Sequence, residues 1–289
     1  MKYSARTPVT IISFLFLLML TGMSKIVLSG PVLYVHDNAG KLATLDATTG
    51  SIDIIGDMGI TMTDIAFSPT GDLYGISFGR LYAIDSDTAQ ATLIGSHAVP
   101  GGNTLVFGED GTLYSAGYMS TSLYTIDVSN GATTNLGSMG FFAGGDLAFH
   151  NGHLYMASLS NKLVDIDLDD LSNTVAIGNF AIGGVFGLAT GSDNNLYAVA
   201  NTAVFSVNTT TGGVIDLVSF AKQGLGQAFG LTSFIPDDIV IAAEIAEPTT
   251  IMLLLSGLLG RSCKINLTVA EVLYTRKFRQ YMVVLCGSG

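Results

Sequence analysis

Two sets of acidic and polar residues in this sequence could support chemistry. The first set, which precedes a series of short apolar segments, consists of Asp64, Asn103, Asp146 and Gln227. If these segments line a common channel, the four side chains would form a polar, partly anionic ring for a small ligand or a cation. An alternative is a hydrolase or lyase that acts through Asp64 and Asp146 at the mouth of this channel. The structural alternative is that all four only cap strand ends.

The second set, Asp165, Asp167 and Asp169, places carboxylates at alternate positions, as at the start of a calcium-binding loop. An EF-hand loop requires Gly at its sixth position and Glu at its twelfth, where this sequence has Asp170 and Ala176. The alternative is that Asp167 accepts hydrogen bonds from the backbone of a turn. Calcium is the only cofactor for which the sequence offers ligands, and no other is expected.

The sequence contains no recognisable arrangement of nucleophile and base, and we assign no catalytic residue. Residues 75–79 match the G-x-S-x-G pattern, but that motif needs a strand-to-helix turn, and no helix is expected after this strand. We expect the four histidines in surface turns, without the further ligands that a transition metal requires. They are His36, His97, His150 and His153.

An internal repeat of about 40 residues defines the elements that position these side chains. The dipeptide Leu-Tyr begins at positions 33, 73, 113, 154 and 196. A second series, with Leu81–Asp85 and Leu123–Asp127 as typical copies, ends at positions 46, 85, 127, 167 and 208. Each unit contains four short segments with alternating polarity, separated by turns rich in Gly, Asp, Asn and Ser. Four strands in about 40 residues are typical of a propeller blade.

The two ends of the repeat region predict that the ring is closed. The first unit lacks its innermost strand, and residues 228–234 resemble the innermost strand at residues 185–189. We therefore predict an all-β fold, a five-bladed β-propeller of four-stranded antiparallel blades, with N- and C-terminal strands completing one blade. An open solenoid is the alternative. The repeat is similar to that of bacterial secreted propellers, best at Asp46–Gly50 and Asn208–Gly212, and the resemblance implies architecture but little chemistry.

Both ends of the chain have the composition of targeting segments. Residues 1–30 combine a basic start with an apolar run, which predicts a secretory signal peptide, an uncleaved anchor being the alternative. The propeller is expected at 31–236, a linker at 237–250, and a short apolar segment with an irregular basic tail at 251–289. Both cysteines lie in this tail, so the propeller is expected to fold without disulfides.

Glu247 and Pro248, the apolar run after them and Arg261 resemble the PEP-CTERM sorting signal of bacterial envelope proteins. The resemblance implies an exosortase-like processing enzyme as a partner and a setting of exopolysaccharide or biofilm matrix. Two departures are that Ala246 stands where the first Pro is usual and that the apolar run is about ten residues, against the roughly 20 that span a bilayer. The sequence after Arg261 is unlike the signal, as a frame shift would produce.

The charge distribution restricts the partners. Between Gly30 and Glu247 there are four basic and 22 acidic residues, a net charge of −18, so nucleic acid is rejected as a partner. We therefore expect an exported protein of the cell envelope or the extracellular space that contacts membrane only through its terminal segments. Our first hypothesis is a non-catalytic propeller that binds an extracellular glycan or protein or serves as a structural component. The alternative is a hydrolase or lyase acting on a carbohydrate or lactone at the channel mouth.

Overall fold

The computed structural model describes residues 30–234, 266–272 and 279–285. The chain divides into two compact units, Met1–Pro236 and Asp237–Gly289. The expected signal peptide and the sorting residues Glu247, Pro248 and Arg261 lie outside the described residues.

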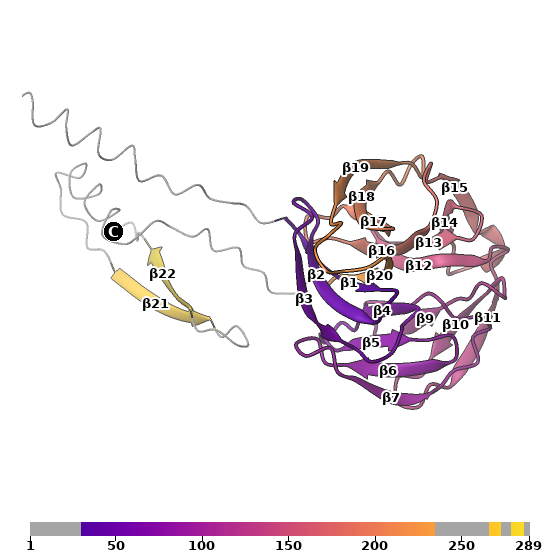
Figure 1. Cartoon of the computed structure of the whole chain (residues 1–289), viewed down its shortest axis with the longest axis horizontal. Coiled ribbons are helices and arrows are strands. Elements are labelled where there is room, and N and C mark those ends of the chain that lie inside the picture. The colour runs from indigo at the N-terminus through magenta and orange to yellow at the C-terminus, as the bar shows by residue number, and fades with distance from the viewer. Residues whose placement is uncertain (1–29, 235–265, 273–278, 286–289) are drawn as a thin grey trace, which may run out of the picture. The chain divides into compact units, whose positions relative to one another are not determined.

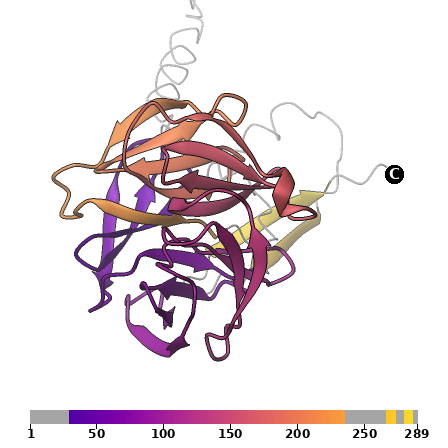
Figure 2. The same cartoon turned by 90° about the vertical axis from the view of Figure 1, so that its right-hand side faces the viewer.

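The first unit contains five four-stranded antiparallel sheets, which confirms the predicted five-bladed propeller (Figures 1 and 2). In each blade the strands are given from the innermost to the outermost. Blade 1 consists of β20 (Ala228–Thr232), β1 (Val32–Asp37), β2 (Lys41–Asp46) and β3 (Ile52–Asp57). Blade 2 consists of β4 (Asp64–Phe67), β5 (Leu73–Ile76), β6 (Arg80–Ile84) and β7 (Ala91–Ser96).

The other three blades follow the same order. Blade 3 consists of β8 (Val106–Phe107), β9 (Leu113–Ser115), β10 (Ser122–Ile126) and β11 (Thr133–Ser138). Blade 4 consists of β12 (Ala143–His150), β13 (His153–Ser158), β14 (Lys162–Ile166) and β15 (Val175–Asn179), with the 3₁₀ turn η2 (Leu171–Asn173) before its last strand. Blade 5 consists of β16 (Val185–Thr190), β17 (Leu196–Ala200), β18 (Ala203–Val207) and β19 (Val214–Ser219).

The five innermost strands form a closed ring in which each contacts the next, in the order β20, β4, β8, β12, β16 and back to β20. Closure depends on the C-terminal strand, as the sequence predicts. β20 pairs antiparallel with β1, with Val35 opposite Leu231 and His36 opposite Gly230. Blade 1 is therefore assembled from the two ends of the repeat region and has four strands like the other blades.

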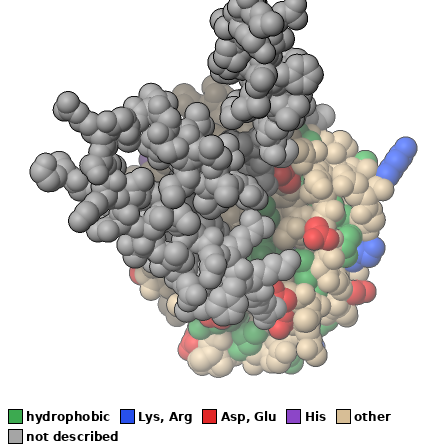
Figure 3. All heavy atoms as spheres, turned by 90° about the vertical axis from the view of Figure 1, so that its left-hand side faces the viewer, with side chains coloured by type: hydrophobic (Ala, Val, Ile, Leu, Met, Phe, Trp, Pro, Cys, Tyr) green, Lys and Arg blue, Asp and Glu red, His purple; other side chains and the backbone are tan. Residues whose placement is uncertain are grey.

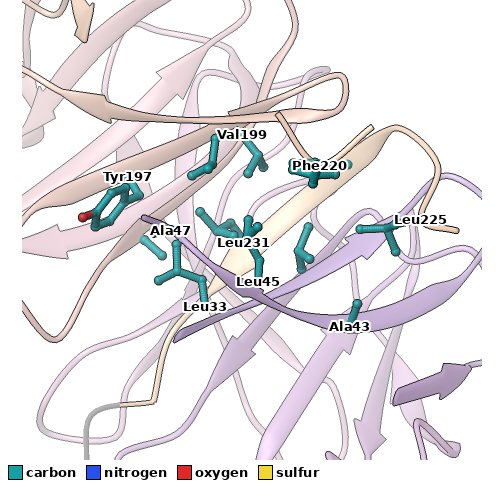
Figure 4. Close-up of a cluster of buried hydrophobic side chains, with 13 residues drawn as sticks. Leu33, Ala43, Leu45, Ala47, Tyr197, Val199, Phe220, Leu225 and Leu231 are labelled. Atoms are coloured by element: carbon teal, nitrogen blue, oxygen red, sulfur yellow. The ribbon is translucent and has the colours of Figure 1, made fainter. Parts of the chain in front are cut away.

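The core lies between the blades. Five clusters of buried apolar side chains each join two neighbouring blades, because the inner strands present apolar residues on both faces. The cluster between blades 1 and 5 includes Leu33 and Leu45 from blade 1, Val199 from blade 5, and Leu231 from the closing strand (Figure 4). Closure of blade 1 thus also completes this cluster.

Polar turns join the strands, and the last residue of the repeat motif organises one in every blade. Asp46, Asp85, Asp127, Asp167 and Asn208 each accept hydrogen bonds from backbone N–H groups two or three residues further on. This Asx-turn role is the one that the sequence offered for Asp167 as the alternative to calcium binding.

The second unit contains an antiparallel pair, β21 (Asn266–Val272) and β22 (Arg279–Leu285), with Val269 opposite Met282. Both strands lie within residues 251–289 and are rich in β-branched and other apolar residues. No helix among the described residues is long and apolar enough to cross a membrane.

Ring closure by β20 makes a prediction about two leucines. Leu231→Ala should lower the free energy of unfolding by about 2–5 kcal/mol, because Leu231 is buried between blades 1 and 5. The matched change Leu159→Ala, at a side chain 61% exposed, should cost less than about 0.5 kcal/mol. Urea denaturation of both variants measures the difference. Equal effects would mean that the C-terminal strand does not complete blade 1.

Candidate functional site

The innermost strands bring Asp64 and Asp146 together at the centre of the ring. Asp64 is the first residue of β4 and Asp146 lies within β12, and both are completely buried. Their carboxyl groups are hydrogen-bonded to each other. The sequence analysis placed the two aspartates at an open channel mouth. In the structure they lie buried among the innermost strands.

Five backbone N–H groups, one from each blade, donate to these two carboxyl groups. Asp64 accepts from Ile65 N at 2.8 Å and from Leu105 N at 2.6 Å. Asp146 accepts from three backbone nitrogens: Leu147 N at 2.6 Å, Leu188 N at 2.7 Å and Leu231 N at 3.4 Å. An innermost strand has no neighbour on its axial edge, so its inward N–H groups need other acceptors. The aspartates meet this need for all five blades.

Glycine occupies the equivalent position in two blades because the carboxyl groups and their neighbours need the space. A Cβ atom on Gly230 would lie 2.5 Å from Asp64 Oδ1 and 2.5 Å from His36 Nε2. A Cβ atom on Gly187 would lie 2.7 Å from the Cβ of Leu231. Both distances are too short for non-bonded atoms, so a larger residue at either position would displace the site.

His36 lies opposite Gly230 and faces Asp64 across it. Its side chain is completely buried, and neither ring nitrogen has a hydrogen-bond partner among the described residues. Burial lowers the pKa of His36 to about 4, so the imidazole is neutral at pH 7. In blades 2 and 5 the same register position holds Ile76 and Val199, so a polar ring replaces an apolar side chain in blade 1.

The carboxyl pair retains a proton at neutral pH. Burial raises the pKa of Asp64 well above its usual range, and the adjacent Asp146 carboxyl raises it further. Burial also raises the pKa of Asp146 to about 7, although its hydrogen bonds from Asp64 and from the backbone oppose the shift. The two carboxyl groups therefore titrate as a unit and share a proton in the hydrogen bond between them.

Asn103 and Gln227 do not hydrogen-bond to this pair. Asn103 precedes Thr104, which is the true counterpart of Asp64 in blade 3, and its side-chain oxygen has no partner among the described residues. Gln227 precedes Gly230 by three residues, and its backbone oxygen accepts from Asn38 N. The structure thus joins two of the four residues predicted from the sequence and adds His36 and Gly230, which the sequence analysis missed.

The aspartates of the proposed calcium loop contact different partners. Asp165 pairs with His153 at 2.9 Å, while Asp167 accepts the N–H groups of Asp169 and Asp170 within its turn. Among the described residues no three His, Cys, Asp or Glu side chains are grouped so that they could hold a metal ion. The histidine prediction was wrong for three of the four residues, because His36, His97 and His150 are buried and only His153 is exposed.

No protein-family model matches the sequence, and no curated protein is similar to it in sequence. Three solved structures illustrate what the fold is similar to. A chain of a nidogen/laminin complex is 12% identical over 70% of this chain and 98% of its own length, with a TM-score of 0.49. A gluconolactonase from Xanthomonas campestris is 15% identical over 70% of this chain and 80% of its own length, with a TM-score of 0.47. Virginiamycin B lyase from Staphylococcus aureus is 12% identical over 68% of this chain and 72% of its own length, with a TM-score of 0.40.

The central hydrogen bonds predict a graded set of stability losses. Asp146→Ala leaves three buried N–H groups without acceptors and should cost about 3 kcal/mol or more. Asp127→Ala removes acceptors only from an exposed turn and should cost about 1 kcal/mol or less. Chemical denaturation compares the two variants with the parent protein. A similar small loss in both would show that the ring does not depend on the pair.

The buried proton predicts how stability changes with pH. The carboxyl pair binds protons more tightly in the folded state, so its contribution is complete at low pH and is lost as pH rises through 7. His36 has the opposite effect, since its folded pKa of about 4 makes stability rise between pH 4 and 6.5. Above pH 6.5 only the carboxyl contribution changes, so the urea midpoint should fall from pH 6.5 to 8.5. Asp64→Asn should flatten this decline, and a parent midpoint that rises would contradict the shared proton.

Proposed function

We propose that this protein is an exported β-propeller of the cell envelope that binds a partner or serves as a structural component and does not catalyse a reaction. Its partner is an extracellular glycan or protein. In this proposal residues 1–30 direct export, and Glu247, Pro248 and Arg261 form a sorting signal for an exosortase-like enzyme. The terminal segments then place the propeller at the envelope, in an exopolysaccharide or biofilm setting.

The non-catalytic part of the proposal rests on the burial and hydrogen bonding of Asp64 and Asp146. Both side chains are 0% exposed, and all four carboxyl oxygens accept backbone N–H groups of the innermost strands. A general acid or base must reach the proton that it transfers on a substrate. The hydrogen bonds of the pair instead hold the blades together. In this proposal Asp64 and Asp146, on which the hydrolase or lyase alternative depended, therefore have a structural role.

The exposed histidine and the serine of the G-x-S-x-G match support the same proposal. His153 is the only exposed histidine among the described residues, and it pairs with Asp165 on blade 4. Ser77, the serine of the G-x-S-x-G match, directly follows β5 in a short turn to β6. A nucleophile elbow requires a helix after the strand, and here another strand follows.

Processing at the C-terminal segment tests the sorting part of the proposal. In a host that produces an exosortase, mass spectrometry of the mature protein should show cleavage after the propeller. The double variant Glu247→Ala, Pro248→Ala should keep the full C-terminus, because it lacks the motif on which the resemblance rests. The control Asp237→Ala, Asp238→Ala, which changes two residues of the same linker, should be processed normally. An unprocessed parent protein would refute this part.

A further inference from the structure

The propeller is polarised in charge between its two sides. The turns that join the first strand to the second and the third to the fourth lie on one side, because successive strands are antiparallel. These turns and the strand ends beside them hold eleven of the eighteen carboxylates of residues 30–234, and no Lys or Arg. Gly30 and Phe234, the described ends of the propeller chain, lie on this side, which we call the carboxylate side.

Figure 3 looks onto the molecule from the left of Figure 1. Where the surface is in view, Asp and Glu side chains (red) appear at several places, and the Lys and Arg side chains (blue) lie at the edge. All four basic residues of the propeller belong to the opposite side. Lys41, Arg80 and Lys162 begin third strands, and Lys222 lies in the connection before β20. The described carboxylates at strand ends on that side are Asp57 and the buried Asp37, both of blade 1, and the buried Asp64 at the start of β4.

The basic side also carries an exposed apolar patch across blades 2, 3 and 4. It comprises Phe78, Tyr118, Met119, Phe142 and Leu159, which are between 42% and 64% exposed. They all lie in turns and strand connections, not on the sheets.

Two contacts join residues of this patch, one between blades 2 and 3 and one within blade 4. The rings of Phe78 and Tyr118 meet edge to face at 5.7 Å between blades 2 and 3. In blade 4, Leu159 N donates to Phe142 O at 2.9 Å. Large exposed apolar patches of this kind mark interaction surfaces.

Cations flank the patch at both ends. Arg80 follows Phe78 by two residues, and Lys162 follows Leu159 by three. Neither makes an ion pair with a described carboxylate. Exposed aromatic and aliphatic side chains in loops, with Lys and Arg beside them, fit the boundary between acyl chains and anionic headgroups.

The net negative charge of the propeller does not oppose such a contact. Its strands are four to six residues long in blade 2, which separates the two sides by roughly 13–20 Å. At physiological ionic strength the screening length is about 8 Å, so a surface on the basic side is largely shielded from the carboxylates. The complementary charge is that of an anionic lipid surface.

We propose that the basic side of blades 2–4 docks on a membrane surface rich in anionic phospholipid. Phe78, Tyr118, Met119, Phe142 and Leu159 enter the headgroup region, and Arg80 and Lys162 contact lipid phosphates. This inference rests on the proposed envelope location and deepens it. It adds a contact made by the propeller to any contact made by the terminal segments.

Co-sedimentation of the full chain with vesicles tests the proposal. Binding is expected with phosphatidylcholine–phosphatidylglycerol vesicles, and weaker binding with pure phosphatidylcholine vesicles and at high salt. The variant Phe78→Ser, Met119→Ser, Leu159→Ser should lose about tenfold or more in affinity. Replacing Arg80 and Lys162 by Gln should cost about fivefold for each cation.

Matched variants separate the possible outcomes. Leu93→Ser, Leu136→Ser, Val175→Ser changes exposed apolar residues on the outermost strands of the same three blades and should bind vesicles like the parent. Leu253→Asp, Leu255→Asp disrupts the C-terminal apolar run. If only this second variant loses binding, the docking proposal is overturned while the proposed function stands. Concentration-dependent self-association through the patch, without vesicle binding, would also overturn it.

Discussion

The structure depends on how five backbone N–H groups at the centre of a closed ring find acceptors. Each innermost strand has a sheet partner on one edge only, and burial of its other edge without acceptors would cost about 1–3 kcal/mol for every unpaired group. Two carboxyl groups, Asp64 and Asp146, accept from all five strands. Because two aspartates serve five blades, the blades cannot be identical, and Thr104, Gly187 and Gly230 take the corresponding positions.

The shared proton follows from the same arrangement. Two ionised carboxylates in contact inside a buried site would repel each other, and five neutral N–H donors compensate only part of that cost. Retention of one proton between Asp64 and Asp146 removes one charge and supplies the hydrogen bond that joins them. His36 remains neutral beside them for the same reason, since burial disfavours a further charge.

Architecture was predictable because it is encoded many times. The recurring Leu-Tyr dipeptides and turn aspartates gave the period, the strands and the turns, and the likeness of residues 228–234 to 185–189 gave the closure. The centre was only partly predictable, because it is encoded once. Asp64 and Asp146 stood out as acidic residues beside apolar strands. Thr104 and Gly230 can be recognised as the counterparts of the aspartates only when the innermost strands are aligned residue by residue, with Leu105 and Leu231 at equivalent positions. The burial of His36 had no local signal, because the residues around a histidine do not show whether its side chain lies in a turn, at a strand edge or in a core.

The pairing of β1 with β20 has a consequence for the order of events in folding. Tyr34 and Thr232 are opposite one another in blade 1, although the whole of the other four blades separates them along the chain. During synthesis on a ribosome, the sheet of the first blade is complete only when the last strand has been made. Contacts of such long sequence separation form slowly, because their loop-closure entropy is lost before they contribute. Until β20 arrives, Asp146 also lacks the N–H group of Leu231. The final strand therefore completes the ring, and a nascent chain stays open until its propeller sequence has been synthesised in full.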